Sequence, residues 1–169
     1  MRWTVGLKRI ATGLGLVMCL LAGTGCKGED PVNKDLEQYV QQDLHNIRTY
    51  LRAAQDQYKS SMNKDDFAKS QHIRKKVIPQ YDKYLTSLKK VETKTGFVDN
   101  LHDGGLQAVT DTINSLSEYS KVMLKRDSHL TMRSRQSAEE AMDKLDQWQS
   151  EVREEARSRG IKLPSEYVR

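Results

Sequence analysis

Apolar residues recur every three or four positions along most of this chain. Between residues 31 and 62 the steps from one apolar residue to the next are 4, 4, 4, 3, 4, 3, 4 and 4. This spacing follows the α-helical turn of about 3.6 residues and gathers the apolar side chains into one stripe. Such a helix must bury its stripe against other elements, and Asp30 followed by Pro31 is typical of its N-terminus. The stripe consists of Val32, Leu36, Val40, Leu44, Ile47, Leu51, Ala54, Tyr58 and Met62.

A second stripe extends from Phe67 to Val91 and is interrupted by Pro79. A proline inside a helix removes one backbone hydrogen bond and clashes with the preceding turn. We therefore expect a kink or a short break near Val77. Gly96 is predicted to end this helix, because glycine adopts the left-handed conformation of a helix C-terminus without strain.

A third stripe, Leu106–Met123, predicts a helix that begins near Asp103 or one turn earlier. Asp103, Gly104 and Gly105 together are typical of a turn before that helix. No predicted strand precedes these residues, so they do not match a phosphate-binding loop.

A fourth stripe covers residues 138–156. Ser137 and Glu140 have the spacing of a capping box, which predicts a helix start at this point. Gly160 is predicted to end the helix. The apolar rhythm continues between the third and fourth stripes, so these helices are either fused into one rod or separated by a cap near Asp127.

The four stripes predict the fold class. No segment alternates with the period of two that strands require, and Val and Ile are scarce, so we expect an all-α protein. An up-down four-helix bundle over residues 31–160 buries every stripe, with residues 161–169 as a C-terminal tail. The alternative is a three-helix antiparallel coiled-coil-like array with a long last helix.

The N-terminus has the pattern of an export signal. Arg2, Lys8 and Arg9 precede twelve uncharged residues, Ile10–Leu21, and a run of small residues then leads to Cys26. A charged start, a short apolar stretch and small residues before a cleavage point define a signal peptide. A transmembrane helix needs about 20 mostly apolar residues, which this stretch does not supply.

The residues before Cys26, Leu-Leu-Ala-Gly-Thr-Gly, resemble the lipobox of bacterial lipoproteins. Thr24 and Gly25 suit the two positions before the cysteine, whereas Gly23 stands where leucine is usual. The resemblance implies removal of residues 1–25, a diacylglyceryl group on the Cys26 thiol, and fatty-acyl chains such as palmitate. Residues 26–30 then form a short tether. The alternative is ordinary cleavage that leaves a soluble protein with one free thiol.

The residue after the cysteine bears on localisation. Lys27 rather than aspartate follows Cys26, and in lipoproteins of Gram-negative bacteria this implies sorting to the outer membrane, facing the periplasm. The formal charge of +5 includes three positive charges from residues 1–25, which leaves +2 for the rest of the chain. This small excess gives no support to nucleic acid as a partner.

Catalytic and metal-binding patterns are missing from the sequence. The four histidines lie on different predicted segments and are interpreted as surface residues; they are His45, His72, His102 and His129. Asp99-x-x-His102 occurs once, whereas a di-iron bundle needs two Glu-x-x-His motifs. No nucleophile, zinc or haem-attachment motif is present. We therefore predict no catalytic residue, no cofactor and no enzyme activity.

Charge is distributed unevenly. Residues 64–94 hold nine Lys or Arg against four acids, and residues 137–159 hold four against seven. One interpretation is that these two helices complement each other across the bundle, which adds little stability. The other is that a basic patch meets anionic lipid headgroups or an acidic partner. The candidate patch residues are Arg74, Lys75, Lys76, Lys89 and Lys90.

Together these patterns predict a membrane-anchored helical lipoprotein that acts as a binding or structural module with a protein partner in the cell envelope. One alternative is a small-molecule, metal or haem carrier that uses the bundle interior. Another is a periplasmic holding chaperone, although Leu130-Thr131 lacks the Gln that the L-T-x-x-Q pattern of such chaperones requires.

Overall fold

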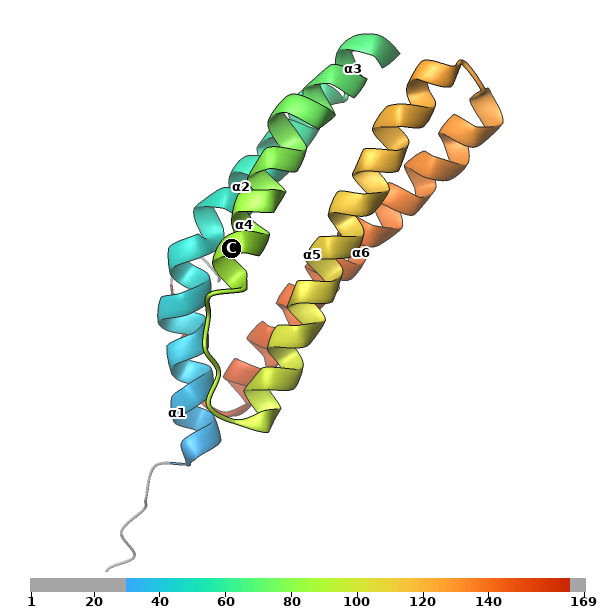
Figure 1. Ribbon diagram of the computed structural model, residues 1–169. Helices are drawn as coiled ribbons and strands as arrows, with labels where there is room; N and C mark the ends of the chain where they lie inside the picture. The colour runs from blue at the N-terminus through green and yellow to red at the C-terminus, as the bar shows by residue number, and fades with distance from the viewer. Residues whose placement is uncertain (1–29, 165–169) are drawn as a thin grey trace, which may run out of the picture.

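A computed structural model describes residues 30–164, and their helices form an up-down four-helix bundle without strands (Figure 1). The all-α bundle prediction is therefore confirmed. The third and fourth helices are separate, so the three-helix alternative is wrong. The first helical segment comprises α1 (Pro31–Gln38), the π-helical turn η1 (Tyr39–Asp43) and α2 (Leu44–Ser61). The second comprises α3 (Asp66–His72), the π-helical turn η2 (Ile73–Val77) and α4 (Ile78–Leu88). The third is α5 (Gly96–Val122), which is followed by the 3-10 turn η3 (Met123–Lys125). The fourth is α6 (Ser128–Ser158).

The first segment begins as predicted. The Asp30 carboxylate accepts a hydrogen bond from the Val32 backbone N–H at 3.0 Å, and Pro31 is the first helical residue. The π-helical turn η1 was not predicted. Three consecutive steps of four residues lead to Leu44, and each advances about 40° beyond a full α-helical turn. The wider turn of η1 absorbs this drift and keeps the apolar stripe on the core.

The second segment contains the predicted irregularity. Asp65 caps α3 by accepting from the Ala68 backbone N–H at 2.8 Å. The break expected near Val77 takes the form of η2, which ends just before Pro79. A π-helical turn at this point accommodates the missing proline N–H without ending the helix.

Gly96 does not end the second helix, and that prediction is wrong. The helix stops at Leu88, and Gly96 is the first residue of α5, which Thr95 caps by accepting from the Val98 backbone N–H. The helix therefore starts two turns before Asp103. The physical reason is the cap: a threonine in extended conformation satisfies one of the N-terminal amides.

The buried Asp35 fixes the connection between α4 and α5. Its Oδ2 accepts hydrogen bonds from the Lys94 backbone N–H at 2.9 Å, the Thr95 backbone N–H at 2.8 Å and Thr95 Oγ1 at 2.7 Å. Residues 91–95 are not helical, so a side chain of the first helix supplies the acceptor for the Lys94 and Thr95 donors.

Gly104 and Gly105 lie inside α5, so the predicted turn at these residues is wrong. The reason is tertiary packing. The Trp148 ring of α6 lies against the α5 backbone, and a Cβ at position 105 would come within 2.4 Å of its Cζ2 atom. Trp148 Nε1 donates to the Leu101 carbonyl oxygen at 2.7 Å. Glycine is therefore used here for close approach between helices rather than for a turn.

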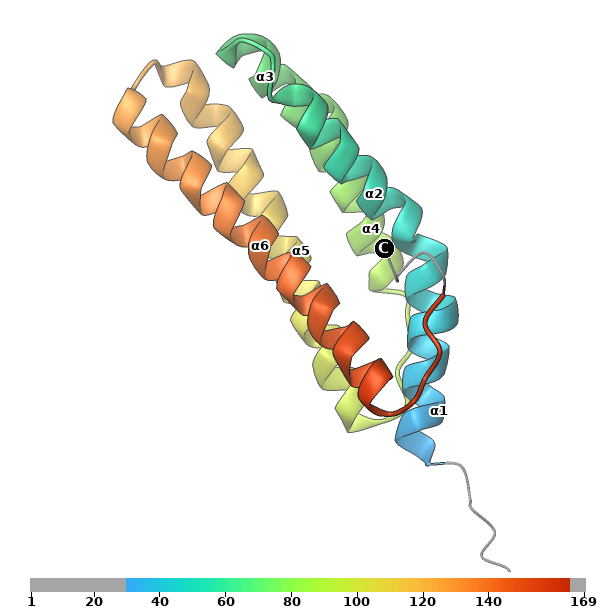
Figure 2. The same ribbon diagram turned by 180° about the vertical axis from the view of Figure 1, so that it is seen from behind.

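The fourth helix starts at the cap near Asp127 rather than at Ser137. Asp127 accepts from the Leu130 backbone N–H at 3.0 Å, and Ser137 lies within the continuous helix α6, so the predicted capping box is wrong. The predicted C-terminus is correct. Gly160 has φ +73°, its N–H bonds to the Arg157 carbonyl, and the Ile161 N–H bonds to the Ala156 carbonyl. Residues 161–164 then return along α1, seen from behind in Figure 2.

Within residues 30–164, the buried core cluster and the apolar side chains packed against it extend from Leu36 to Leu163. Around this core, α4 packs against α2 and α5, whereas α6 packs mainly against α5 and also touches α1 (Figures 1 and 2). The helices α4 and α6 therefore lie diagonally. Among residues 30–164, no helix combines the length and the apolar character needed to cross a membrane.

Several predictions concern residues outside the described range. These are the signal peptide 1–25, the lipidation of Cys26 and most of the tether 26–30. The end of the C-terminal tail, residues 165–169, also lies outside it.

Candidate interaction surface

The two hairpin turns meet at the end of the bundle opposite Pro31 (Figures 1 and 2). One turn joins α2 to α3 and the other joins α5 to α6, and α3 packs against η3. The buried Ser70 hydroxyl ties them together by donating to the Ser120 carbonyl oxygen at 2.6 Å. We call this end, residues 62–69 and 121–133, the tip surface.

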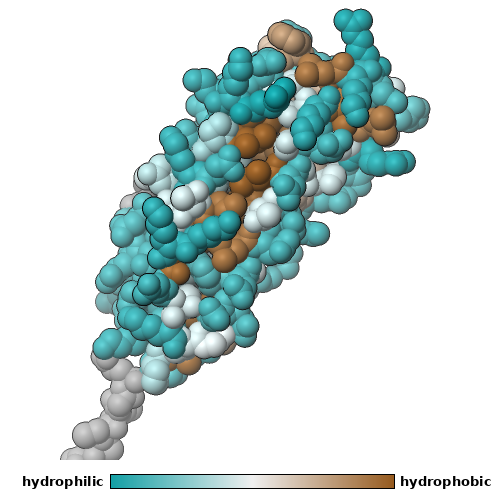
Figure 3. All heavy atoms as spheres, in the orientation of Figure 1, coloured by the Kyte–Doolittle hydropathy of each residue, from teal (hydrophilic) through white to brown (hydrophobic). Residues whose placement is uncertain are grey.

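The tip surface carries most of the exposed apolar side chains. Six large hydrophobic residues are exposed in the described chain, and five of them lie here. Phe67 and Met132 are the most exposed, at 65% and 66%. Figure 3 shows apolar residues gathered at this upper end, above a seam of apolar side chains between the two hairpins. The five residues are Met62, Phe67, Leu124, Leu130 and Met132.

Two of these residues correct the sequence interpretation. Met62 and Phe67 continue the apolar stripes of the first and second helices, yet they are exposed because the chain turns between them and no part of residues 30–164 covers this end. Several exposed apolar residues at one end of a protein are a signal of binding, whereas single exposed residues such as Tyr50 are ordinary.

Positive charge surrounds this apolar group. Residues 62–69 and 121–133 contain six Lys or Arg and three Asp. Asp65 and Asp127 are both engaged as helix caps, so their charges face the positive ends of helix dipoles. The lysines and arginines therefore dominate the potential at the tip surface.

The charge separation runs along the bundle rather than across it. The ranges 59–76 and 118–135, which we call the far-end ranges, contain the tip surface and the helical turns next to it. They hold eleven Lys or Arg against four acidic residues, whereas the rest of residues 30–164 holds twelve Lys or Arg against seventeen acidic residues. Because α4 and α6 are diagonal, the predicted complementarity between these two helices is not the arrangement observed.

The predicted basic patch is divided between two places. Arg74, Lys75 and Lys76 are exposed on η2, directly after α3, and extend the positive region of the tip surface. Lys89 and Lys90 are exposed at the C-terminus of α4, about 20 Å away along the helix axis. The five residues therefore do not form one patch.

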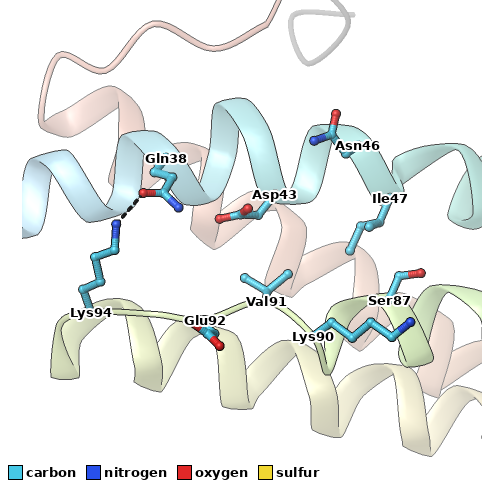
Figure 4. A pocket seen from close by; sticks show the side chains of 9 residues that line it. All are labelled: Gln38, Asp43, Asn46, Ile47, Ser87, Lys90, Val91, Glu92 and Lys94. Carbon is cyan, nitrogen blue, oxygen red and sulfur yellow. Dashed lines mark hydrogen bonds between the residues drawn. The ribbon is translucent and has the colours of Figure 1, made fainter.

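A surface cavity of about 500 Å³ lies between the first helix and the 89–95 connection (Figure 4). Asp43 and Lys90 are among its lining residues, and Lys94 Nζ donates to Gln38 Oε1 at 2.6 Å on its wall. Burial raises the pKa of the Asp43 carboxyl, and the nearby Lys94 opposes this shift. The lining mixes both charge signs with Ile47 and Val91, without a convergent set of donors.

His102 is not a surface residue, contrary to prediction. It is buried on α5, and its ring meets Tyr39 edge-on with centroids 5.8 Å apart and Nδ1 3.4 Å from the Tyr39 hydroxyl. Burial lowers the pKa of the imidazole, and Asp103 and Asp99 oppose this shift. Within residues 30–164, no three His, Cys, Asp or Glu residues gather as metal ligands.

Comparison of the chain with protein-family models, with curated proteins and with solved structures finds no match.

Proposed function

We propose that this chain is a lipoprotein of the bacterial cell envelope that acts by binding. In this proposal Cys26 carries the lipid, residues 26–30 tether the bundle to the membrane, and the tip surface binds the partner. The residues before Cys26 support the anchor, because they resemble a lipobox after an apolar stretch. With Lys27 after the cysteine, we propose the outer membrane, with the bundle facing the periplasm.

The length of the bundle supports different roles for its two ends, anchoring at one and binding at the other. The first helical segment has 8, 5 and 18 residues in α1, η1 and α2, so it extends about 46 Å from its start. A lipid at Cys26 would hold one end at the membrane and raise the concentration of the other end for a partner in the same compartment.

One observation carries the proposal: the exposed apolar residues of the described chain gather with uncompensated positive charge at the end opposite Pro31. Burying a large apolar side chain contributes about 1.5–3 kcal/mol, so exposing Phe67 and Met132 is an unusual feature for a structural end alone. Binding by a contact surface, without chemistry, is the function that this composition favours.

The test compares four forms of the full chain in a bacterial host that processes lipoproteins: the parent, Cys26→Ser, Phe67→Ser/Met132→Ser, and the control Tyr50→Ser, which changes an exposed aromatic residue outside the tip surface. Membrane fractionation after a high-salt wash, which releases contacts made through the charges of the tip surface, measures anchoring, and pull-down from detergent-solubilised membranes measures binding. We expect Cys26→Ser to leave the membrane fraction and the tip double variant to lose what the parent and Tyr50→Ser retain. A Cys26→Ser variant that fractionates like the parent refutes the anchor, and a tip variant that retains every ligand refutes the binding end.

A further inference from the structure

Five large apolar side chains are exposed at one end of the bundle, the tip surface. Phe67 lies in the first turn of α3 and Met132 in the second turn of α6, beside the two hairpin turns. Their side chains are 65% and 66% exposed. Exposed Phe, Met and Leu side chains flanked by cations match the boundary between the headgroups and the acyl chains of a lipid bilayer.

The cations of the tip surface are placed to meet phosphate headgroups around such an insertion. Lys64 belongs to the first turn, and Lys125 and Arg126 belong to the second, next to Leu124. All three cations are exposed. Basic residues that flank inserted apolar side chains gain from the negative surface potential of anionic lipids.

The charge separation along the bundle selects an end-on approach. The far-end ranges carry an excess of seven positive charges, and the rest of residues 30–164 carries an excess of five negative charges. An anionic surface attracts the first region and repels the second, so a bilayer that faces the free end of the rod, opposite the anchored end, is met by the tip surface first.

We infer that the tip surface binds anionic phospholipid bilayers by inserting Phe67 and Met132 among headgroups held by the surrounding lysines and arginines. This membrane contact does not depend on an acyl chain at Cys26. The inference rests on the proposed function in that it names the ligand of the same surface.

The experiment uses residues 26–169, the chain that the proposed cleavage leaves, with Cys26→Ser, because the substitution removes the acyl contribution. Binding is measured by flotation with phosphatidylcholine vesicles that contain or lack about one third phosphatidylglycerol. We expect binding to the anionic vesicles only, with a strong decrease as salt screens the charges.

Two pairs of matched variants separate insertion from nonspecific attraction. Phe67→Ser/Met132→Ser should weaken binding about tenfold or more, while Tyr50→Ser stays within about twofold of the parent. Lys64→Gln/Lys125→Gln should weaken binding by roughly 30-fold at low salt, while Lys89→Gln/Lys90→Gln, which removes the same charge from the distant pair, stays close to the parent. Far-UV circular dichroism checks that each variant keeps the fold.

The remaining outcomes identify what has failed. Equal binding to neutral and anionic vesicles, or no binding to either, overturns the lipid inference. If immobilised polyglutamate retains the parent but not the tip variants, and vesicles do not bind the parent, the partner is an acidic protein. The tip surface then remains the binding end. If the tip variants equal the parent on vesicles, on polyglutamate and in the membrane pull-down, the proposed binding end is wrong as well.

Discussion

Gly105 is the position at which one added methyl group most directly tests the contact between α5 and α6. A Cβ at this residue would lie 2.4 Å from Trp148 Cζ2 and 2.6 Å from Cε2. These atoms belong to a rigid ring that is 4% exposed and that donates to the Leu101 carbonyl oxygen at 2.7 Å. The ring must shift by about 1 Å to reach ordinary contact distance, which strains both its packing and its hydrogen bond.

The expected magnitude follows from three opposing terms. Overpacking a core costs about 1–3 kcal/mol, and a weakened buried hydrogen bond costs about 1 kcal/mol more. The higher helix propensity of alanine offsets about 1 kcal/mol of this destabilisation. We therefore expect Gly105→Ala to lower the free energy of unfolding by about 1–3 kcal/mol.

Gly104 supplies the matched control on the neighbouring residue of the same helix. It is exposed, and its Cβ would meet Trp148 Cδ1 at 3.6 Å, an ordinary contact. Gly104→Ala should therefore gain the helix propensity without the clash and raise the free energy of unfolding by about 0.5–1 kcal/mol.

The assay is urea unfolding of residues 26–169, followed by circular dichroism and by the fluorescence of Trp148, the single tryptophan in this range. Gly105→Ala should also shift the Trp148 emission to longer wavelength as the ring loses its cover. If Gly105→Ala is as stable as Gly104→Ala, with unchanged emission, Trp148 does not pack on the α5 backbone and the reasoning is refuted.

Three further predictions use the same unfolding measurement. Asp35→Ala removes the buried acceptor of three hydrogen bonds and should cost about 2–4 kcal/mol; an unchanged midpoint would contradict its role in holding the connection to α5. Arg126 has φ 56°, so Arg126→Gly should stabilise the bundle by about 1 kcal/mol, and a loss would show that the left-handed conformation is not strained. Burial lowers the pKa of His102 below its ordinary value of 6.5, so the unfolded chain takes up the proton first and stability falls as the pH drops below about 6.5. His102→Gln should lose less stability than the parent between about pH 7.5 and about pH 5.5, and an equal loss would assign the pH dependence to other groups.

The four helices were predictable because each buries one stripe, and burial imposes the helical period on the sequence. The π-helical turns left weaker signals. Pro79 marked η2, and the three successive steps of four residues up to Leu44 marked η1. Both signals are local: a proline and the spacing of apolar residues each constrain the backbone within a few residues.

Tertiary packing explains two of the failures. A pair of glycines predicts a turn when only neighbouring residues are considered. Only the position of Trp148, more than forty residues later, shows why α5 needs a surface without Cβ atoms. The tip surface could not be predicted from the sequence for the same reason. Phe67 fits an apolar stripe, and its exposure depends on which turns meet at the end of the bundle. The exposure of these residues is therefore a property of topology rather than of any one segment.

The proposed function requires a covalent link between Cys26 and a membrane lipid. This link can be measured by the intact mass of the chain extracted from membranes of a host that processes lipoproteins. We expect a polypeptide of residues 26–169 with the added mass of a diacylglyceryl group on Cys26. A mature chain that starts at another residue, or one that starts at residue 26 without fatty-acyl mass, contradicts it.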